Sequence, residues 1–169
     1  VQHGNNHDGY EFYKYKTEPN DSDLPRTFED QKRDIEEGTA RMNRFGQITG
    51  LYSGKIMIFP GGISPTWTLK LLKEHNFNIT ANSSSIPLNA KPGKNLDFMM
   101  RPADMNYANF PSLKRYHPGK VNPCLELFID KPLLLYDHPW DFIQGAKTYN
   151  DFADSINNIY GGVSWQSLD

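Results

Sequence analysis

Two histidines near the start of the chain have a spacing that suits a metal ion. His3 and His7 lie four positions apart, with Gly4, Asn5 and Asn6 between them. This spacing brings two imidazoles together on one side of a helical turn or in a tight loop, and zinc takes neutral nitrogen ligands of this kind. A catalytic zinc ion also needs a third protein ligand and an open position for water. The pair therefore indicates part of a metal site, although two polar residues at a frayed chain end would show the same pattern.

A second candidate for chemistry follows a short apolar run. Residues 133–136 read Leu-Leu-Leu-Tyr and lead directly into Asp137 and His138. A strand over this run would place a titratable pair at its carboxyl end, where the active sites of α/β barrels and open sheets lie. Histidine suits a general acid at that position, because its ordinary pKa lies near neutral pH. A surface turn with a packed histidine is the alternative.

The composition indicates one globular domain over residues 1–169. Hydrophobic residues are 37% and charged residues 22%, which is typical of a folded chain with a core. The net charge of −2 gives no reason to expect nucleic acid or a membrane surface as a partner. No apolar run approaches the roughly 18 residues of a membrane span. Because Cys124 is the single cysteine, an internal disulfide and a cysteine zinc cluster are both excluded.

The first long element predicted is a helix. Thr27 is a suitable cap, and Asp30 three positions later strengthens the start. The helix should run to about Phe45, with Gly46 and Gly50 ending it. One apolar stripe recurs along this segment, made of Phe28, Ile35, Met42 and Phe45.

A strand, a helix and a strand follow within about 25 residues. Residues 56–59 form a short apolar run that suits a strand buried on both faces. Ser64 and Pro65 indicate a helix start, and residues 77–81 predict the second strand. Such a βαβ unit should be parallel and right-handed.

The second half of the chain continues the alternation of helix and strand. Residues 83–123 carry six prolines and predict a long irregular segment, which is often functional. A second apolar run covers residues 125–129, ahead of the expected strand at 133–136. Apolar residues at helical spacing predict a last helix over residues 149–160, and residues 163–165 predict a closing strand. The whole pattern favours the α/β class.

Taken in order, four of these segments resemble the polysaccharide deacetylases of the NodB-homology type (carbohydrate esterase family 4). The first is the His-x-x-x-His pair, and the second is the Met-Ile-Phe-Pro-Gly-Gly sequence at residues 57–62. The third is Leu-Leu-Tyr-Asp-His at residues 134–138, and the fourth is Val-Ser-Trp-Gln-Ser-Leu at residues 163–168. The resemblance covers nearly the whole chain.

The resemblance implies a fold, a cofactor and a reaction. The fold would be a distorted (β/α)7 barrel, of which this chain is the C-terminal part. The cofactor would be one divalent metal ion, usually zinc, and the reaction would be removal of acetyl groups from a polysaccharide or oligosaccharide. By this resemblance His3 and His7 would be metal ligands, and His138 would be the catalytic acid. The substrate-binding residues would be Phe59, Pro60, Gly61, Tyr136, Asp137 and Trp140.

The chain also departs from the pattern of this family. In the family a motif upstream of the histidine pair supplies the third ligand and the catalytic base, so we expect both from a further N-terminal segment of the same protein. The family's Arg-x-Pro arginine is Ile58 here, and its usual Leu-His-Asp reads Leu135, Tyr136 and Asp137, with His138 two positions on. No match to the aspartate and tryptophan of the fourth motif is visible.

Two rival functions remain open at this point. One is a non-catalytic carbohydrate-binding module on the same fold, in which aromatic residues such as Tyr10, Trp67 and Trp140 bind the sugar. The other is a structural or assembly protein, which the long proline-rich segment would suit. A polysaccharide substrate is consistent with an extracellular or periplasmic location, and the sequence leaves the location open.

Overall fold

A computed structural model describes most of the chain, and the site is built from these residues. The described residues are 1–7, 11–12, 26–62, 65–82, 96–98, 105–107, 110–118, 122–129, 131–143, 145–159 and 162–166.

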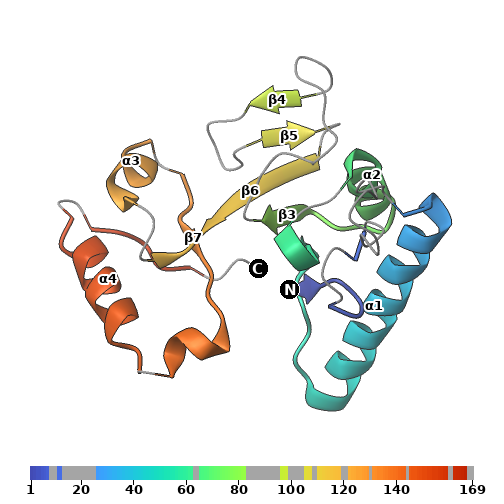
Figure 1. Cartoon of the computed structure of the whole chain (residues 1–169), viewed down its shortest axis with the longest axis horizontal. Helices are drawn as coiled ribbons and strands as arrows, with labels where there is room; N and C mark the ends of the chain where they lie inside the picture. The colour runs from blue at the N-terminus through green and yellow to red at the C-terminus, as the bar shows by residue number, and fades with distance from the viewer. Residues whose placement is uncertain are drawn as a thin grey trace, which may run out of the picture.

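The centre of the molecule is a curled sheet of five parallel strands that forms half of a barrel (Figure 1). Its strands, in spatial order, are β1 (Gln2–His3), β2 (Ile56–Ile58), β3 (Ile79–Asn82), β6 (Phe110–Tyr116) and β7 (Leu134–Leu135). Two further strands, β4 (Leu96–Phe98) and β5 (Met105–Tyr107), are antiparallel and extend the sheet beside the first half of β6. The second half of β6 pairs with β7.

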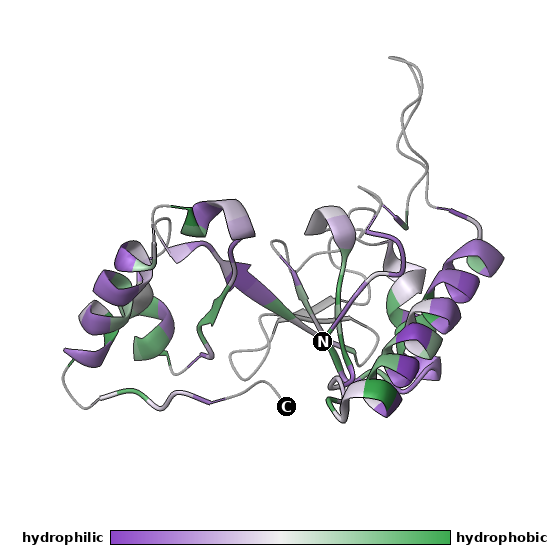
Figure 2. Ribbon diagram, turned by 90° about the horizontal axis from the view of Figure 1, so that it is seen from below, coloured by the Kyte–Doolittle hydropathy of each residue, from purple (hydrophilic) through white to green (hydrophobic). Residues whose placement is uncertain are grey.

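The four α-helices of the described part of the chain lie in two pairs, one at the β1 end of the sheet and the other at the β7 end (Figures 1 and 2). Their bounds are α1 (Phe28–Thr49), α2 (Thr66–Glu74), α3 (Pro123–Phe128) and α4 (Lys147–Asn157). Two short 3-10 helices are η1 (Pro60–Gly62) and η3 (Pro139–Phe142). None of the described helices is both long enough and apolar enough to span a bilayer.

The two faces of the sheet carry different residues, because successive side chains of a strand point to opposite faces. Met57 belongs to a core cluster that includes Ile35 of α1 and Leu69, Leu71 and Leu72 of α2, so these helices cover its face. The opposite face, which we call the inner face, carries a second cluster around Ala81 and Leu113. The register places His3 beside Ile58, on this inner face. Arg115 lies beside Leu134 on the same face.

Several elements expected from the sequence are confirmed. The hydroxyl oxygen of Thr27 accepts a hydrogen bond from the backbone N–H of Asp30 at 3.2 Å, so the cap of α1 lies where it was predicted. β2, α2 and β3 form the expected parallel βαβ unit. The last helix, α4, also lies in the predicted region. Each of these predictions used a local sequence pattern, namely a cap, short apolar runs or apolar residues at helical spacing.

Other expectations were wrong in detail. The helix α1 ends at Gly50, which has φ 73° and was expected to end it, but the helix continues past Phe45 to Thr49, so Gly46 lies inside it. Phe28 and Phe45 are 45% and 47% exposed, so they are not part of a buried stripe. The segment expected to be irregular contains β4, β5 and β6. No strand forms at residues 163–165. Pro65, rather than Ser64, precedes the first residue of α2.

Candidate functional site

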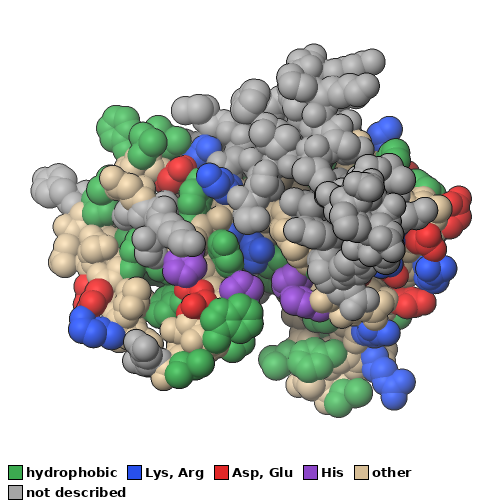
Figure 3. Space-filling view, viewed as in Figure 1, with side chains coloured by type: hydrophobic (Ala, Val, Ile, Leu, Met, Phe, Trp, Pro, Cys, Tyr) green, Lys and Arg blue, Asp and Glu red, His purple; other side chains and the backbone are tan. Residues whose placement is uncertain are grey.

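The carboxyl ends of the parallel strands carry most of the residues with candidate chemistry. β1 ends at His3, β6 is followed by His117, and β7 is followed by Tyr136, Asp137 and His138. In α/β proteins, functional sites lie at this edge of the sheet. In the space-filling view the histidines gather near the centre of one face, on both sides of a gap in the surface (Figure 3). The structure therefore brings the two candidate segments to one edge.

The histidine pair lies on a tight loop that directly follows β1. Gly4 and His7 have positive φ angles of 60° and 56°, which fold the loop back on itself. The rings of His3 and His7 then lie 4.5 Å apart between centroids, with their planes at 51°. Both side chains reach solvent. The spacing of the two histidines allows either a helical turn or a tight loop, and the structure has the tight loop.

A buried carboxylate holds this loop in shape. The side chain of Glu11 accepts hydrogen bonds from the backbone N–H groups of Asn5, Asn6 and His7 at 2.6, 3.2 and 3.1 Å. Glu11 is fully buried, and this burial raises the pKa of its carboxyl group. Three successive N–H groups that converge on one carboxylate fix the backbone that carries His7. Glu11 is therefore a positioning residue for the pair.

Helix α1 packs against the outer side of the same loop. Arg41 donates to the carbonyl oxygen of Asn5 at 2.9 Å and to the side-chain oxygen of Asn6 at 3.1 Å. Gly38 allows the close approach, because a Cβ at this position would overlap the Gln2 amide. The loop is thus held between Glu11 on one side and the middle of α1 on the other.

We expect the Gly4→Ala variant to lose more stability than a glycine variant in open space. A Cβ at Gly4 would overlap the Glu11 carboxylate and lie 2.6 Å from Cγ of Pro60, whereas nothing lies within 4 Å of a Cβ at Gly50. Both glycines have positive φ, so Gly50→Ala isolates the backbone cost of about 1–2 kcal/mol. Gly4→Ala should cost about 2–5 kcal/mol in the free energy of unfolding by urea. Equal costs for the two variants would show that the loop does not depend on this contact.

The surroundings of His3 keep its imidazole neutral over most of the pH range. Partial burial of the ring lowers the pKa of His3 from its ordinary value of 6.5 to about 4. The positive charges of His7 and Arg115 lower the pKa further, and His138 has a smaller effect of the same sign. A neutral imidazole is the form that binds a metal ion. The effect of Arg115 and His138 on this pKa indicates that both side chains lie within electrostatic range of His3.

In the metal-free protein, we expect the His3 ring to titrate near pH 4 in an NMR experiment. The unfolded chain would take up this proton near pH 6.5, so it binds more protons than the folded chain between these values. The free energy of unfolding should therefore fall as the pH falls from about 6.5 to 4. His7→Ala should raise the pKa of His3, because a repelling charge is removed. A His3 pKa that stays near 6.5 would contradict this description of the loop.

A second group of polar side chains surrounds Asp137. Nε2 of His117 lies 3.4 Å from Oδ2 of Asp137, and the Tyr149 hydroxyl donates to the same oxygen. The Asp137 side chain is only 3% exposed. A hydrogen bond with Asp137 and one from the backbone of His138 lower the pKa of the exposed Asp141 carboxyl. Asp137 thus joins β7, the end of β6 and helix α4.

The ring of His138 is held from two directions. Its backbone N–H donates to Oδ1 of Asp137 at 2.9 Å and to Oδ2 of Asp141 at 3.2 Å. Its imidazole stacks on the indole of Trp140, with ring centroids 4.3 Å apart and planes at 10°. The ring of Tyr136 lies edge-on at 6.2 Å. These contacts fix the direction of the predicted catalytic acid at the carboxyl end of β7.

The described residues contain one group of three side chains with metal-ligand geometry. His117, Asp137 and Asp141 each offer a ligand atom, and these atoms lie within 4.8 Å of one another. His3 and His7 do not belong to this group. Groups of exposed acidic side chains are common in proteins that bind no metal, so this group alone identifies no ion. A measurement of metal binding must therefore distinguish this group from the pair formed by His3 and His7.

The predicted substrate-binding residues fall into two classes. Phe59 and Pro60 are buried, and the Phe59 ring packs edge-on against Phe12 at 5.1 Å. Because both side chains are buried, they have no exposed surface that a substrate could contact. Gly61 is exposed on η1, and Trp140 is 61% exposed. Tyr136 is partly buried, and the Asp137 carboxylate faces His117 and Tyr149 rather than solvent.

Sequence reasoning missed two residues at this edge. Glu11 follows a glycine- and asparagine-rich loop, and no local signal distinguishes it from a surface carboxylate. Arg115 lies in the segment that was expected to be irregular. Its guanidinium carbon lies 4.7 Å from the centroid of the Tyr136 ring, across the pair formed by β6 and β7. Both residues depend on contacts between distant parts of the chain.

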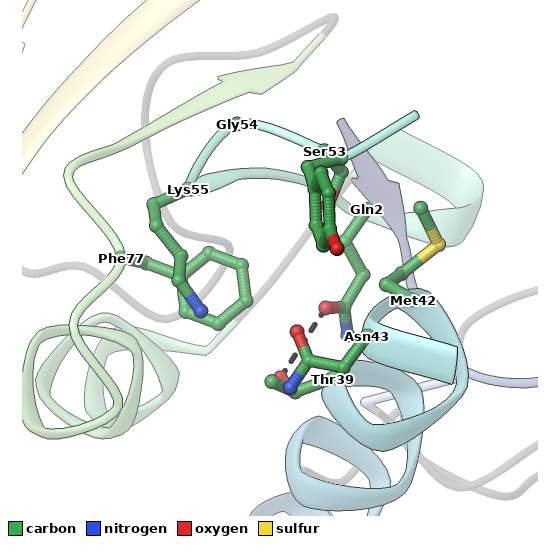
Figure 4. A pocket seen from close by; sticks show the side chains of 9 residues that line it. Gln2, Thr39, Met42, Asn43, Ser53, Gly54, Lys55 and Phe77 are labelled. Carbon is green, nitrogen blue, oxygen red and sulfur yellow. Dashed lines mark hydrogen bonds between the residues drawn. The ribbon is translucent and has the colours of Figure 1, made fainter. Parts of the chain in front are cut away.

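A small cavity lies between β1 and α1, on the side of the sheet that α1 covers (Figure 4). Its lining includes Gln2, Thr39 and Phe77, and the Thr39 hydroxyl donates to the Gln2 side-chain oxygen at 3.3 Å. Its volume of about 30 Å³ is enough for one or two water molecules and too small for a sugar. We therefore assign it to the packing of α1 and not to the functional site.

Comparison of the chain with known protein families, with curated proteins and with solved structures gave no match.

Proposed function

We propose that the chain is a metal-dependent hydrolase that removes acetyl groups from a polysaccharide or oligosaccharide, on the C-terminal part of a NodB-type barrel. One observation carries this proposal. The paired rings of His3 and His7 follow β1, and His138 follows β7 at the same carboxyl edge of the parallel sheet, within electrostatic range of His3. A site for a metal ion and a proton donor on the same edge is the arrangement that acyl hydrolysis needs.

His3 and His7 would hold the metal ion. Their ring nitrogens are ligands of the type that zinc takes, and His3 is neutral above about pH 4. When bound, such an ion polarises an acyl carbonyl group and lowers the pKa of a water molecule. The described residues provide no third side chain grouped with this pair. Asp8, which follows His7 directly and lies outside the described residues, is the nearest candidate in the sequence.

Side chains that follow β7 would protonate the leaving group and contact the sugar. His138 would give a proton to the nitrogen or oxygen of the sugar as it leaves the acyl group. The fixed backbone of His138 and its stacking on Trp140 keep the imidazole in one direction. The exposed indole of Trp140 offers a flat apolar surface against which a sugar ring can pack.

A carbohydrate-binding role without catalysis is the second candidate. The observation that favours it is Trp140, which is 61% exposed and covers one face of the His138 ring. An aromatic surface of this kind binds sugar whether or not a metal ion is present. Under this alternative, His138 would support the indole and would transfer no proton.

Acetate release separates the two functions. The protein, loaded with zinc, would be incubated with N-acetylated and O-acetylated sugar oligomers, and free acetate would be measured. The proposed hydrolase releases acetate with zinc and stops when a chelator is added. Saturable binding of the oligomers without acetate release, in protein that carries zinc, would contradict the hydrolase and support the binding module.

A further inference from the structure

Arg115 is a partly buried cation on the inner face of the sheet. Its guanidinium lies over the ring of Tyr136, at 4.7 Å from the centroid. Within the described part of the chain it forms no ion pair, and its Nε is buried without a hydrogen-bond acceptor. The carboxylate of Asp137, next to Tyr136 in the sequence, is directed to His117 and Tyr149. The positive charge of Arg115 is therefore not compensated by these neighbours.

This arrangement is unfavourable in the absence of a ligand. Removing a charged group from water costs free energy unless an opposite charge or hydrogen bonds replace the water. The Tyr136 ring offsets only part of this cost, because a cation–π contact is weaker than the lost hydration of a charged group. Partial burial lowers the pKa of Arg115, and its charge in turn lowers the pKa of His3. Arg115 therefore places a positive charge within electrostatic range of the histidine pair.

We propose that Arg115 binds a carboxylate group of the ligand at this edge. A guanidinium presents planar donors that match the two oxygens of a carboxylate, and one positive charge balances one negative charge. The inference rests on the surroundings of Arg115 and does not depend on hydrolysis.

Two ligands supply this chemistry. One is an acidic sugar of the uronate type, which would make the natural ligand an acidic glycan. The other is a small free carboxylate such as acetate. Sodium acetate and methyl glucuronide are therefore the two probes, with methyl glucoside as the neutral control. Binding would be followed by calorimetry on protein that has been freed of metal ions with a chelator and then dialysed into chelator-free buffer, so that neither a metal ion nor the carboxylates of the chelator compete.

We expect the carboxylate probe to bind the wild-type protein and to lose at least about tenfold in affinity in the Arg115→Gln variant. Arg115→Lys keeps the charge without the planar pair of donors, and should fall between the two. Lys114→Gln is the matched control, because it removes the neighbouring positive charge, which projects from the other face of β6, and should bind like the wild type.

The two probes decide between the sources of the carboxylate. Binding of glucuronide alone assigns the site to an acidic sugar, whereas binding of acetate, with or without glucuronide, assigns it to a small carboxylate. No binding of either probe, or equal affinity in wild type and Arg115→Gln, would overturn the proposal. If Arg115→Gln does not fold, the comparison of Arg115→Lys with Lys114→Gln makes the same test. Acetate release is measured separately, so failure of one proposal leaves the other unaffected.

Discussion

The His138→Ala variant should release acetate about 10²–10⁴-fold more slowly than the wild type, which is the usual contribution of a positioned general acid. His138 lies at the carboxyl end of β7, and both its backbone and its ring are held in place. Its loss would leave the departing sugar atom without a proton donor. The zinc content should not change, because the proposed ligands are His3 and His7.

The matched control for this prediction is His75→Ala. His75 follows the end of α2, and its nearest charged partner is Glu36 at 3.8 Å, on the outer side of the molecule. Its removal should leave acetate release unchanged. Trp140→Ala tests the stacking contact, and should raise KM more than it lowers kcat. A His138→Ala variant that keeps full activity would assign the proton transfer to another residue.

The Glu11→Ala variant should lose both stability and the metal ion. It removes a buried carboxylate that accepts three backbone hydrogen bonds, and leaves those N–H groups without their acceptor. We expect a loss of about 2–4 kcal/mol in the free energy of unfolding by urea, measured with a chelator present so that metal binding does not contribute. The zinc content should also fall, because the loop would no longer hold His7 against His3.

Glu37→Ala provides the control at the same loop. Its carboxylate accepts one hydrogen bond, from the Asn5 side chain at 3.0 Å, and this contact is exposed to solvent. Its removal should cost less than about 1 kcal/mol and should leave the zinc content unchanged. Similar losses of stability in Glu11→Ala and Glu37→Ala would show that the buried carboxylate has no special part in the loop.

The sequence predicted the elements whose signals are local. The cap at Thr27 needs only the residues of one helical turn, and the βαβ unit from β2 to β3 is marked by apolar runs and a proline. The spacing of His3 and His7 likewise predicted that their rings would meet, which is a property of a five-residue segment. The α/β class follows from the alternation of these elements.

The rest depends on contacts between distant segments. Six prolines at residues 83–123 concealed β6, the strand that pairs with β3, β5 and β7 at once. Without β6, no sequence pattern places Arg115 near Tyr136, or His117 near Asp137. Glu11 could not be recognised for the same reason, since its role comes from the shape of the loop that it holds. Phe59 was assigned to the substrate by resemblance, and its burial follows from packing against Phe12.

The central claim is that His3 and His7 form a metal site, and zinc content tests it most directly. Purified protein would be loaded with zinc, freed of excess ion and analysed beside two variants, the double variant His3→Ala, His7→Ala and the variant Asp141→Asn. We predict about one zinc ion per chain in the wild type and in Asp141→Asn, and none in the double variant. Zinc that stays in the double variant and is lost from Asp141→Asn would place the ion at His117, Asp137 and Asp141 instead, and would contradict the account.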